Sequence, residues 1–235
     1  MGLEAVIFDM DGVLIDTTEY HYLSWKKVAE RLGIPFTHSD NDRLRRLSRQ
    51  ESLHVLLGGK QVSDDLIHEL LEYKNSCFMN YIEQVEMHEL LPGVFALLWE
   101  LHAAQVPVGV SSSSRNARLI VSRLGINHHI EAICDASNVE KRKPHPDVFL
   151  CAASLLEVKP ENCMVIEEGA AGVQAGLSAG MCVVGVGAGP LTHEAYTTVP
   201  SLENVRLIDL QEIYTAWHAE MMRGESQVMQ QPGFD

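Results

Sequence analysis

The chain has 235 residues, of which 46% are hydrophobic and 21% charged, and this composition supports a sizeable core and argues against disorder. Its 32 acidic and 18 basic residues give a formal net charge of -14. Such a charge repels nucleic acids and anionic membranes, so neither is expected as a partner. A small anionic substrate would need a metal ion or a few well-placed basic residues to offset the overall field.

The five cysteines are widely spaced and form no C-x-x-C pair, so neither a disulfide framework nor a zinc site is expected. The N-terminus lacks the long apolar stretch of a signal peptide, because Glu4 and Asp9 interrupt it. No segment has the roughly 18 successive apolar residues of a membrane span. These features predict a cytoplasmic protein, and a monomer is the expected state.

The first predicted element is a buried strand at residues 5–8, and the pattern then changes to helical spacing. Apolar residues at positions 25, 28, 29 and 32 predict a helix that stops at Gly33, with Asp16 and Glu19 as its capping box. From there to about residue 86 the signals are all helical. They predict three further helices, at residues 40–47, 48–57 and 63–85.

The second half of the chain alternates short apolar runs with helical patterns, the first of which begins at Pro92. Such alternation predicts a parallel sheet with crossover helices on both faces. The predicted strands lie at residues 106–110, 132–134, 164–166, 183–186 and, at one edge, 205–208. The fold class is therefore a doubly wound α/β core of residues 1–15 and 88–222. A helical cap of residues 16–87 is inserted after the first strand, and residues 223–235 form a flexible tail.

The pair Asp9 and Asp11 follows the first predicted strand, at the sheet edge where ligands bind in such folds. A turn with solvated acids is the ordinary alternative. An EF-hand loop would require an oxygen ligand and a glycine where Val13 and Leu14 stand, which excludes it. A magnesium site suits the pair better, because a hard cation prefers carboxylate and carbonyl oxygens.

Three other strand ends carry polar residues. A serine cluster at residues 111–116 opens a helix, which is how backbone N–H groups hold a phosphate, although serine clusters alone are usually loops. Lys143 precedes Pro144 at the start of another helix, where a lone lysine is more often a surface residue. The acidic pair Glu167 and Glu168 ends the fourth predicted strand.

Asp-x-Asp, serine, lysine and an acidic pair, in that order, resemble the motifs of the haloacid dehalogenase superfamily over nearly the whole chain. The resemblance implies that Asp9 is a nucleophile, Asp11 a general acid/base, and that Ser112 and Lys143 neutralise phosphoryl oxygens. It also implies Mg²⁺ as cofactor. The metal-binding residues would be Asp9, Asp11, Glu167 and Glu168. The family usually has Glu-Asp-Ser where this chain has Glu-Glu-Gly, so one expected metal-binding side chain is longer by a methylene.

The predicted cap carries polar residues on its helices. Lys74 lies on the apolar face of the long helix, which is costly unless its charge is used or its stem reaches water. Thr17, His21 and Trp25 recur every four residues along one ridge of the first cap helix. Taken singly, the histidine is ordinarily half-buried and the tryptophan a core residue.

Together with the stretches at residues 47–52 and 73–75, these cap residues resemble the phosphoglucomutase branch of the superfamily. That resemblance implies that Arg49, with Ser114 and Asn116, holds the phosphate that is not being transferred, and that Lys74 helps to line a sugar pocket. It implies that His21 supports the hinge and positions Asp11. The complete substrate-binding set is Thr17, His21, Trp25, Leu47, Ser48, Arg49, Ser52, Lys74, Ser112, Ser113, Ser114, Arg115, Asn116 and Lys143.

The function expected from the resemblance is interconversion of β-D-glucose 1-phosphate and glucose 6-phosphate. It would proceed through an aspartyl-phosphate and a sugar bisphosphate, with a small sugar phosphate as the partner. A sugar-phosphate phosphatase and a non-catalytic sugar-phosphate binding module are the alternatives. A nicotinamide oxidoreductase suggested by Gly185, Gly187 and Gly189 is weak, because these glycines follow the wrong strand for a dinucleotide site.

Overall fold

The computed structural model describes residues 2–44, 47–187, 192 and 194–228. It divides into two compact units. A core unit is made of Met1–Asp16 and Met87–Asp235, and a cap unit of Thr17–Glu86. The cap therefore begins one residue later and ends one residue earlier than the sequence predicts.

The core unit is built on a six-stranded parallel sheet with the order β3-β2-β1-β4-β5-β6. The strands are β1 (Ala5–Asp9), β2 (Val108–Ser111), β3 (Ala132–Cys134), β4 (Cys163–Glu167), β5 (Cys182–Val186) and β6 (Thr197–Val199). All five residues of β1 are buried, because β1 lies in the middle of a sheet that helices cover on both faces. The predicted doubly wound α/β class is confirmed.

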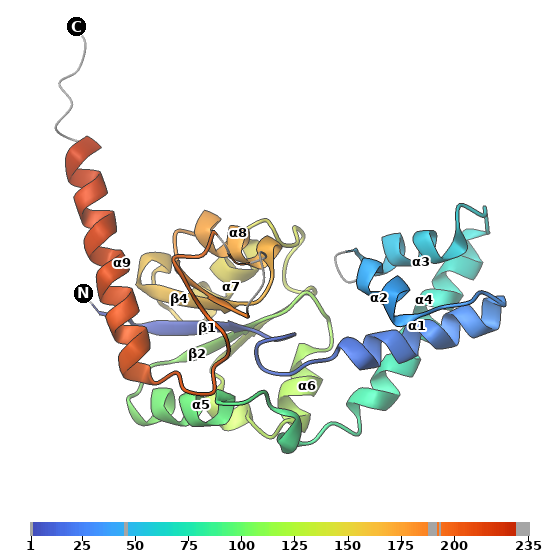
Figure 1. Cartoon of the computed structure of the whole chain (residues 1–235), viewed down its shortest axis with the longest axis horizontal. Coiled ribbons are helices and arrows are strands. Elements are labelled where there is room, and N and C mark those ends of the chain that lie inside the picture. Colours follow the sequence, from blue (N-terminus) through green and yellow to red (C-terminus); the bar gives the residue numbers. More distant parts are fainter. Residues whose placement is uncertain (1, 45–46, 188–191, 193, 229–235) are drawn as a thin grey trace, which may run out of the picture. The chain divides into compact units, whose positions relative to one another are not determined.

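Helices flank this sheet on two sides (Figure 1), with α7 and α8 on one face and α5 and α6 on the other. Their bounds are α5 (Val94–Ala103), α6 (Ala117–Arg123), α7 (Asp147–Leu155), α8 (Ala170–Ser178) and α9 (Leu207–Val228), with short 3-10 turns at Met87–Glu89, Asn127–His129 and Pro160–Asn162. One buried cluster lies between the sheet and the helices α7 and α8, and it includes Ile7, Val165 and Phe149. Alternate residues of each strand therefore face opposite helical layers.

Two predictions at the C-terminal end of the chain are wrong. The strand expected at residues 205–208 is instead the start of α9, where the Arg206 amide donates to the Asp209 carboxylate. The edge of the sheet is formed by β6, whose sequence is mostly threonine. The tail expected from residue 223 is helical as far as Val228, and residues 229–235 lie outside the described part of the chain.

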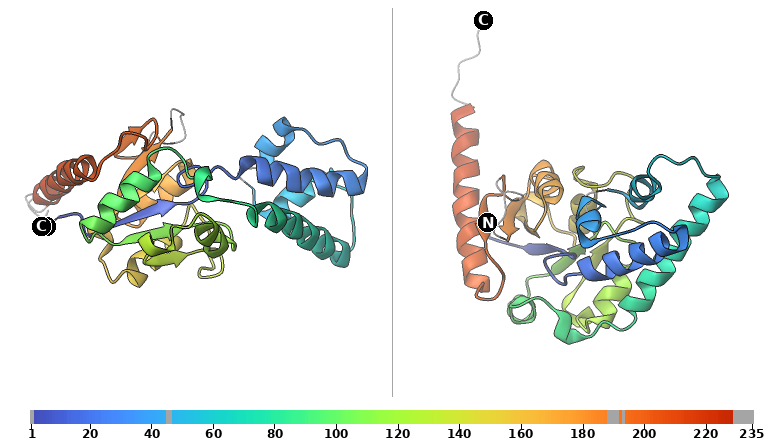
Figure 2. Two further views of the ribbon diagram at one scale, coloured as in Figure 1. Left: turned by 90° about the horizontal axis from the view of Figure 1, so that it is seen from below. Right: turned by 45° about the vertical axis from the view of Figure 1, so that its right-hand side comes forward.

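In the described residues of the cap unit the chain forms four helices, and Figure 2 shows the ribbon from two further directions. They are α1 (Thr18–Leu32), α2 (His38–Leu44), α3 (Arg49–Leu57) and α4 (Asp64–Ile82), and they pack around a cluster that includes Val28, Leu53 and Leu70. Gly33 ends α1 in the left-handed conformation, as predicted. The N-cap of α1 is Thr17, whose side chain makes no capping hydrogen bond, so the prediction of a capping box from Asp16 and Glu19 is wrong.

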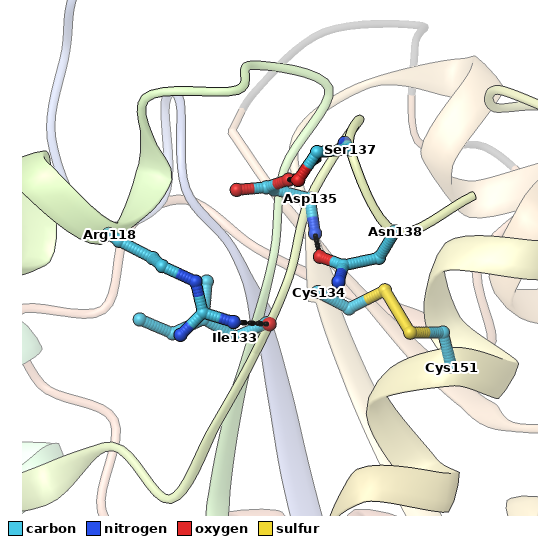
Figure 3. The surroundings of a disulfide bond; sticks show 7 residues. All are labelled: Arg118, Ile133, Cys134, Asp135, Ser137, Asn138 and Cys151. Atoms are coloured by element: carbon cyan, nitrogen blue, oxygen red, sulfur yellow. Dashed lines mark hydrogen bonds between the residues drawn. A yellow bond between two sulfur atoms is a disulfide. The ribbon is translucent and has the colours of Figure 1, made fainter. Parts of the chain in front are cut away.

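A disulfide joins Cys134 at the end of β3 to Cys151 in α7, with 6.2 Å between the Cα atoms (Figure 3). The expectation that disulfides are absent is therefore wrong for this pair. The residues are 17 positions apart, and only the packing of α7 on β3 brings them together. Within the described residues, Cys77, Cys163 and Cys182 carry no disulfide. No described helix is both long and apolar enough to cross a membrane.

Candidate active site

The candidate site lies at the carboxyl edge of the core sheet. Asp9 is the last residue of β1, Ser111 the last of β2 and Glu167 the last of β4. Asp9 and Ser111 are register partners in adjacent strands, so their side chains emerge together. The order of the strands thus places residues from three distant segments at one edge.

Lys143 reaches this edge from the loop between β3 and α7. Its Nζ lies 2.6 Å from Asp9 Oδ1, 2.7 Å from Glu167 Oε2 and 3.3 Å from Ser111 Oγ. The side chain is only 8% exposed, and its ammonium lies 4.6 Å from the centre of the Phe149 ring. Lys143 is therefore a buried cation of the site, and the alternative of a surface lysine is wrong.

Negative charge exceeds positive charge around Asp9. Burial raises the pKa of the Asp9 carboxyl well above its usual value, the Glu167 and Asp11 charges raise it further, and Lys143 offsets only part of this shift. Burial alone would lower the pKa of Lys143, but the carboxylates of Asp9 and Glu167 outweigh it and raise that pKa. Lys143 is thus a permanent cation, while Asp9 requires additional positive charge to ionise easily.

Glu167 is held at both carboxylate oxygens. Oε2 accepts from Lys143, and Oε1 accepts from the backbone amides of Glu168 and Gly169, each at 3.0 Å. Gly172 in α8 leaves room for this carboxylate, because a Cβ at that position would overlap it. Glu167 is therefore engaged in positioning Lys143 and the start of α8.

Asp11 and Gly12 form a tight turn after β1, in which the Gly12 amide donates to Ile15 O at 2.7 Å. Gly12 has a φ of 83°, and a Cβ on it would overlap the Glu168 carboxyl group. The Glu168 side chain therefore covers the backbone beside Asp11. A cavity of about 210 Å³ borders Gly12 and Glu168 on the side of Leu91.

The loop after β2 carries the serine cluster. The Ser112 amide donates to Cys134 O at 3.0 Å, and Ser112 Oγ accepts from the Ser114 amide at 3.0 Å. Ser114 Oγ in turn accepts from the Asn116 amide at 3.2 Å, just before α6 begins. Ser112 is buried, Ser114 and Asn116 are half-buried, and Ser113 and Arg115 are exposed.

In the cap unit, the buried Lys74 pairs with the half-buried His21, with 2.8 Å between Lys74 Nζ and His21 Nδ1. Lys74 is 2% exposed, and its ammonium lies 4.6 Å from the Phe78 ring centre and 5.6 Å from that of Trp25. An ammonium only donates, so Nδ1 must accept and the ring proton is on Nε2. The alternative that Lys74 extends its stem to water is therefore wrong.

The other predicted cap residues differ in exposure. Thr17 and Ser52 are buried, and Trp25 belongs to the hydrophobic cluster of the cap. Ser48 accepts from the Glu51 amide as the N-cap of α3. Arg49, the first residue of α3, is half-buried, whereas Leu47 is exposed.

Three residues of the core site were not predicted from the sequence, namely Ser111, Phe149 and Gly172. Ser111 was counted as part of the loop, although it is the strand residue whose hydroxyl contacts Lys143. The only available signal for it was its place directly after the apolar run. Phe149 and Gly172 carry no signal in the sequence, because their role depends on which helix packs beside Lys143 and Glu167.

The donor chemistry of the edge suits a hard divalent cation, because it offers carboxylate oxygens in a buried region of excess negative charge. The carboxylates do not converge, however. Among the described residues, no three His, Cys, Asp or Glu side chains form a group that could hold an ion. A backbone carbonyl, such as that of Asp11, and solvent would have to complete the coordination of an ion held here.

The core unit is thus a doubly wound sheet whose first strand ends in the buried Asp9, paired with Lys143. Residues 6–186 match the model of the haloacid dehalogenase-like hydrolases, and the chain belongs to this family. The chain is 44% identical over 191 residues to a beta-phosphoglucomutase of Bacillus subtilis, covering 80% of this chain and 84% of the relative.

Two further comparisons place the chain within the family. The crystal structure of a beta-phosphoglucomutase from Clostridium difficile matches with a TM-score of 0.84 and 36% identity, over 92% of this chain and 98% of that one. A fructose-1-phosphate phosphatase of Escherichia coli is 29% identical, over 77% of this chain and 95% of the relative. The chain is thus similar to mutases and, at lower identity, to phosphatases.

Proposed function

We propose that this protein interconverts β-D-glucose 1-phosphate and glucose 6-phosphate, as a β-phosphoglucomutase. The observation that carries a phosphoryl-transfer activity is the buried Asp9 carboxylate, which lies 2.6 Å from the Lys143 ammonium. The similarity to two mutases, at 44% and 36% identity, favours isomerisation over hydrolysis. The buried Asp9 and this similarity together support an enzyme in which the aspartate is phosphorylated transiently, so that the protein is a phosphoprotein during the reaction.

In this proposal Asp9 attacks phosphorus, the bond from phosphorus to the sugar oxygen breaks, and Asp11 supplies the proton to that oxygen. In the opposite transfer, a sugar hydroxyl attacks the aspartyl-phosphate and Asp11 accepts its proton, which forms the bisphosphate. The bisphosphate then turns round, and its other phosphate is transferred to Asp9. Lys143 and Ser112 would neutralise phosphoryl oxygens, which the meeting of two anions requires.

Mg²⁺ is the cofactor that the oxygen donors suit best. Asp9, the backbone carbonyl of Asp11 and Glu168 would hold it, whereas both oxygens of Glu167 are engaged in hydrogen bonds. The ion would supply positive charge that lets a phosphate approach a carboxylate. It would also lower the raised pKa of Asp9 and so favour the ionised form of the nucleophile.

The cap would supply what a mutase requires beyond a phosphatase. Arg49 would bind the phosphate that is not being transferred, assisted by Ser114 and Asn116. Lys74 would contribute to sugar recognition, with Ser52 and Trp25. Supporting observations are that Arg49 is fixed at the first position of α3 by the capping box of Ser48 and Glu51, and that Lys74 is buried beside His21.

The test uses purified protein with Mg²⁺, β-D-glucose 1-phosphate and a trace of glucose 1,6-bisphosphate. Formation of glucose 6-phosphate and release of inorganic phosphate are measured in parallel. We expect glucose 6-phosphate to form many times faster than phosphate is released. Stoichiometric phosphate release without glucose 6-phosphate would exclude the mutase and support a phosphatase.

Arg49→Ala separates the two activities within one experiment. We expect isomerisation to fall by at least 100-fold, roughly the effect of one lost charged contact to a phosphate, while slow phosphate release survives. Arg43→Ala is the matched control, because Arg43 is an exposed arginine of the same unit. Equal isomerisation by the Arg49→Ala variant and its parent would refute the second phosphate site.

A sugar-phosphate phosphatase is the second candidate, favoured by the 29% identity to a fructose-1-phosphate phosphatase. It would share the aspartyl-phosphate but let water complete the reaction. A binding module without catalysis would be stabilised by sugar phosphates yet show no turnover in excess Mg²⁺. The surplus of acidic residues supports a protein that binds neither nucleic acid nor membrane. We also propose that the protein is cytoplasmic and monomeric, and light scattering would test the monomer.

A further inference from the structure

The disulfide closes the loop that carries Lys143. Cys134 ends β3, Cys151 lies in the second turn of α7, and Lys143 is near the middle of their 17-residue separation. The loop begins with a turn in which the Asp135 amide donates to Asn138 Oδ1 at 2.9 Å, as Figure 3 shows. The disulfide thus links β3, which precedes the loop, to α7, which follows it.

Cys134 also adjoins the end of β2 and the serine loop that follows it. Its register partner in β2 is Ser111, whose hydroxyl lies 3.3 Å from Lys143 Nζ. Its carbonyl oxygen accepts from the Ser112 amide at 3.0 Å. On the α7 side, Phe149 packs under the Lys143 ammonium, two residues before Cys151. Both ends of the bridge are therefore next to residues that place Lys143.

The two sulfurs differ in access. Cys134 is fully buried, whereas Cys151 is partly exposed. A thiolate in solution would therefore reach the sulfur of Cys151 first. Cys163 and Cys182 are buried, and burial raises the pKa of each thiol to about 12, so both are almost entirely protonated and slow to react at neutral pH.

We propose that Cys134 and Cys151 form a redox site that controls catalysis by clamping the Lys143 loop. In the oxidised state the bridge holds β3 and α7 together and keeps Lys143 between Asp9 and Glu167. In the reduced state the two thiols must separate to nonbonded distance, and the loop gains freedom. A displacement of about 1 Å in a charged group can reduce a rate by as much as 100-fold.

The chemical step is thiol–disulfide exchange with a small dithiol. A thiolate of the dithiol attacks Cys151 Sγ, the bond between the two protein sulfurs breaks, and Cys134 leaves as a thiolate that takes up a proton. The second thiol of the reagent then attacks the mixed disulfide and releases Cys151. Two electrons and two protons pass from the dithiol to the protein, and the dithiol becomes a cyclic disulfide.

The experiment incubates the full chain with the thiol oxidant diamide or with reduced dithiothreitol, then removes the reagent. Mass spectrometry of alkylated peptides reports the state of the bridge, and melting temperature and the rate of p-nitrophenyl phosphate hydrolysis are measured on both forms. We expect reduction to lower the melting temperature by about 6 to 12 °C, as loop closure predicts, and the rate by roughly tenfold. The first two readouts do not depend on the proposed mutase activity.

Cys151→Ser and Cys151→Ala should both behave like the reduced protein in either reagent. Cys77→Ser is the matched control, because Cys77 is a partly exposed free thiol of the cap unit, and this variant should keep the full response. Absence of a Cys134–Cys151 cross-link after oxidation would overturn the proposal. Equal hydrolysis rates in the oxidised and reduced forms would overturn it too, even if the melting temperatures differed.

Discussion

The Lys143 ammonium lies 2.6 Å from Asp9 Oδ1, and the two side chains are 8% and 11% exposed. The same ammonium lies 2.7 Å from Glu167 Oε2, whose side chain is 4% exposed. One buried cation therefore forms ion pairs with two buried carboxylates. Such an arrangement is costly for folding, since desolvation of the charges offsets much of their attraction. In the proposed mechanism this cost is offset by function, because the cation lies where a phosphoryl group would approach Asp9.

Replacing Lys143 with methionine should abolish most catalysis. The variant keeps the length of the side chain but removes the charge, so we expect kcat to fall by about 100- to 1000-fold, the range for one lost electrostatic contact to a transition state. Phosphate release or isomerisation at saturating substrate measures it. Lys141→Met, in the same loop but exposed, is the control and should retain parental kcat. A Lys143→Met variant within threefold of the parent would contradict the proposed role.

Asp9→Asn should stabilise the protein at neutral pH when no divalent cation is present. The pKa of Asp9 is raised in the folded state, so the folded protein binds this proton more tightly than the unfolded chain does. The ionised carboxylate therefore destabilises the fold above the folded-state pKa, and this penalty disappears as the pH falls toward the unfolded-state pKa. Melting temperatures in EDTA should be higher for Asp9→Asn at pH 7.5 and should converge near pH 4. A variant less stable than its parent at pH 7.5 would contradict this.

Much of this site could be predicted from the sequence because strand ends are visible in it. Asp9 and Glu167 directly end apolar runs, and parallel strands bring their carboxyl ends to one edge. The sequence could not decide between Ser111 and Ser112 as the neighbour of Lys143, because that depends on strand register. The bond between Cys134 and Cys151 depends on how α7 packs, which spacing alone does not reveal.

The incorrect sequence interpretations of residues 205–208 and of Lys74 also have local causes. The run at residues 205–208 is short, and a short apolar run can be a strand or the first turn of a helix. Here the interaction of Asp209 with the Arg206 amide selects the helix. For Lys74, periodicity placed the residue correctly on the buried face of α4. Its partner His21 is 53 residues away, so the sequence could not show which explanation of a buried lysine applied.

Lys74→Met should separate stability from function in the cap. The ammonium is surrounded by the Trp25 and Phe78 rings, so a methionine of similar length can fill the space without the desolvation cost of a charge. We expect the melting temperature to stay within about 3 °C of the parent, as a change near 1 kcal/mol implies. We expect kcat/KM for the sugar phosphate to fall at least tenfold. Lys26→Met, an exposed lysine of α1, is the control, and unchanged kcat/KM in Lys74→Met would remove Lys74 from the sugar site.

Gly12→Ala should weaken metal binding through Glu168. Gly12 has a φ of 83°, and the added Cβ would overlap the Glu168 carboxyl group. The backbone conformation alone costs about 1 to 2 kcal/mol for alanine. Gly33→Ala carries the same cost, because Gly33 has a φ of 66° and open space around it, which makes it the matched control. Both variants should therefore lose similar stability.

Only Gly12→Ala should also displace the Glu168 carboxylate. We expect the Mg²⁺ concentration for half-maximal activity to rise at least tenfold in this variant, the range for loss of an oriented ligand, and to stay at the parental value in Gly33→Ala. Calorimetric titration of each protein with Mg²⁺, without substrate, measures the same change independently of turnover. Because the two variants share the backbone penalty, a difference between their metal affinities reports on Glu168. Identical affinities in all three proteins would show that Glu168 does not bind the metal.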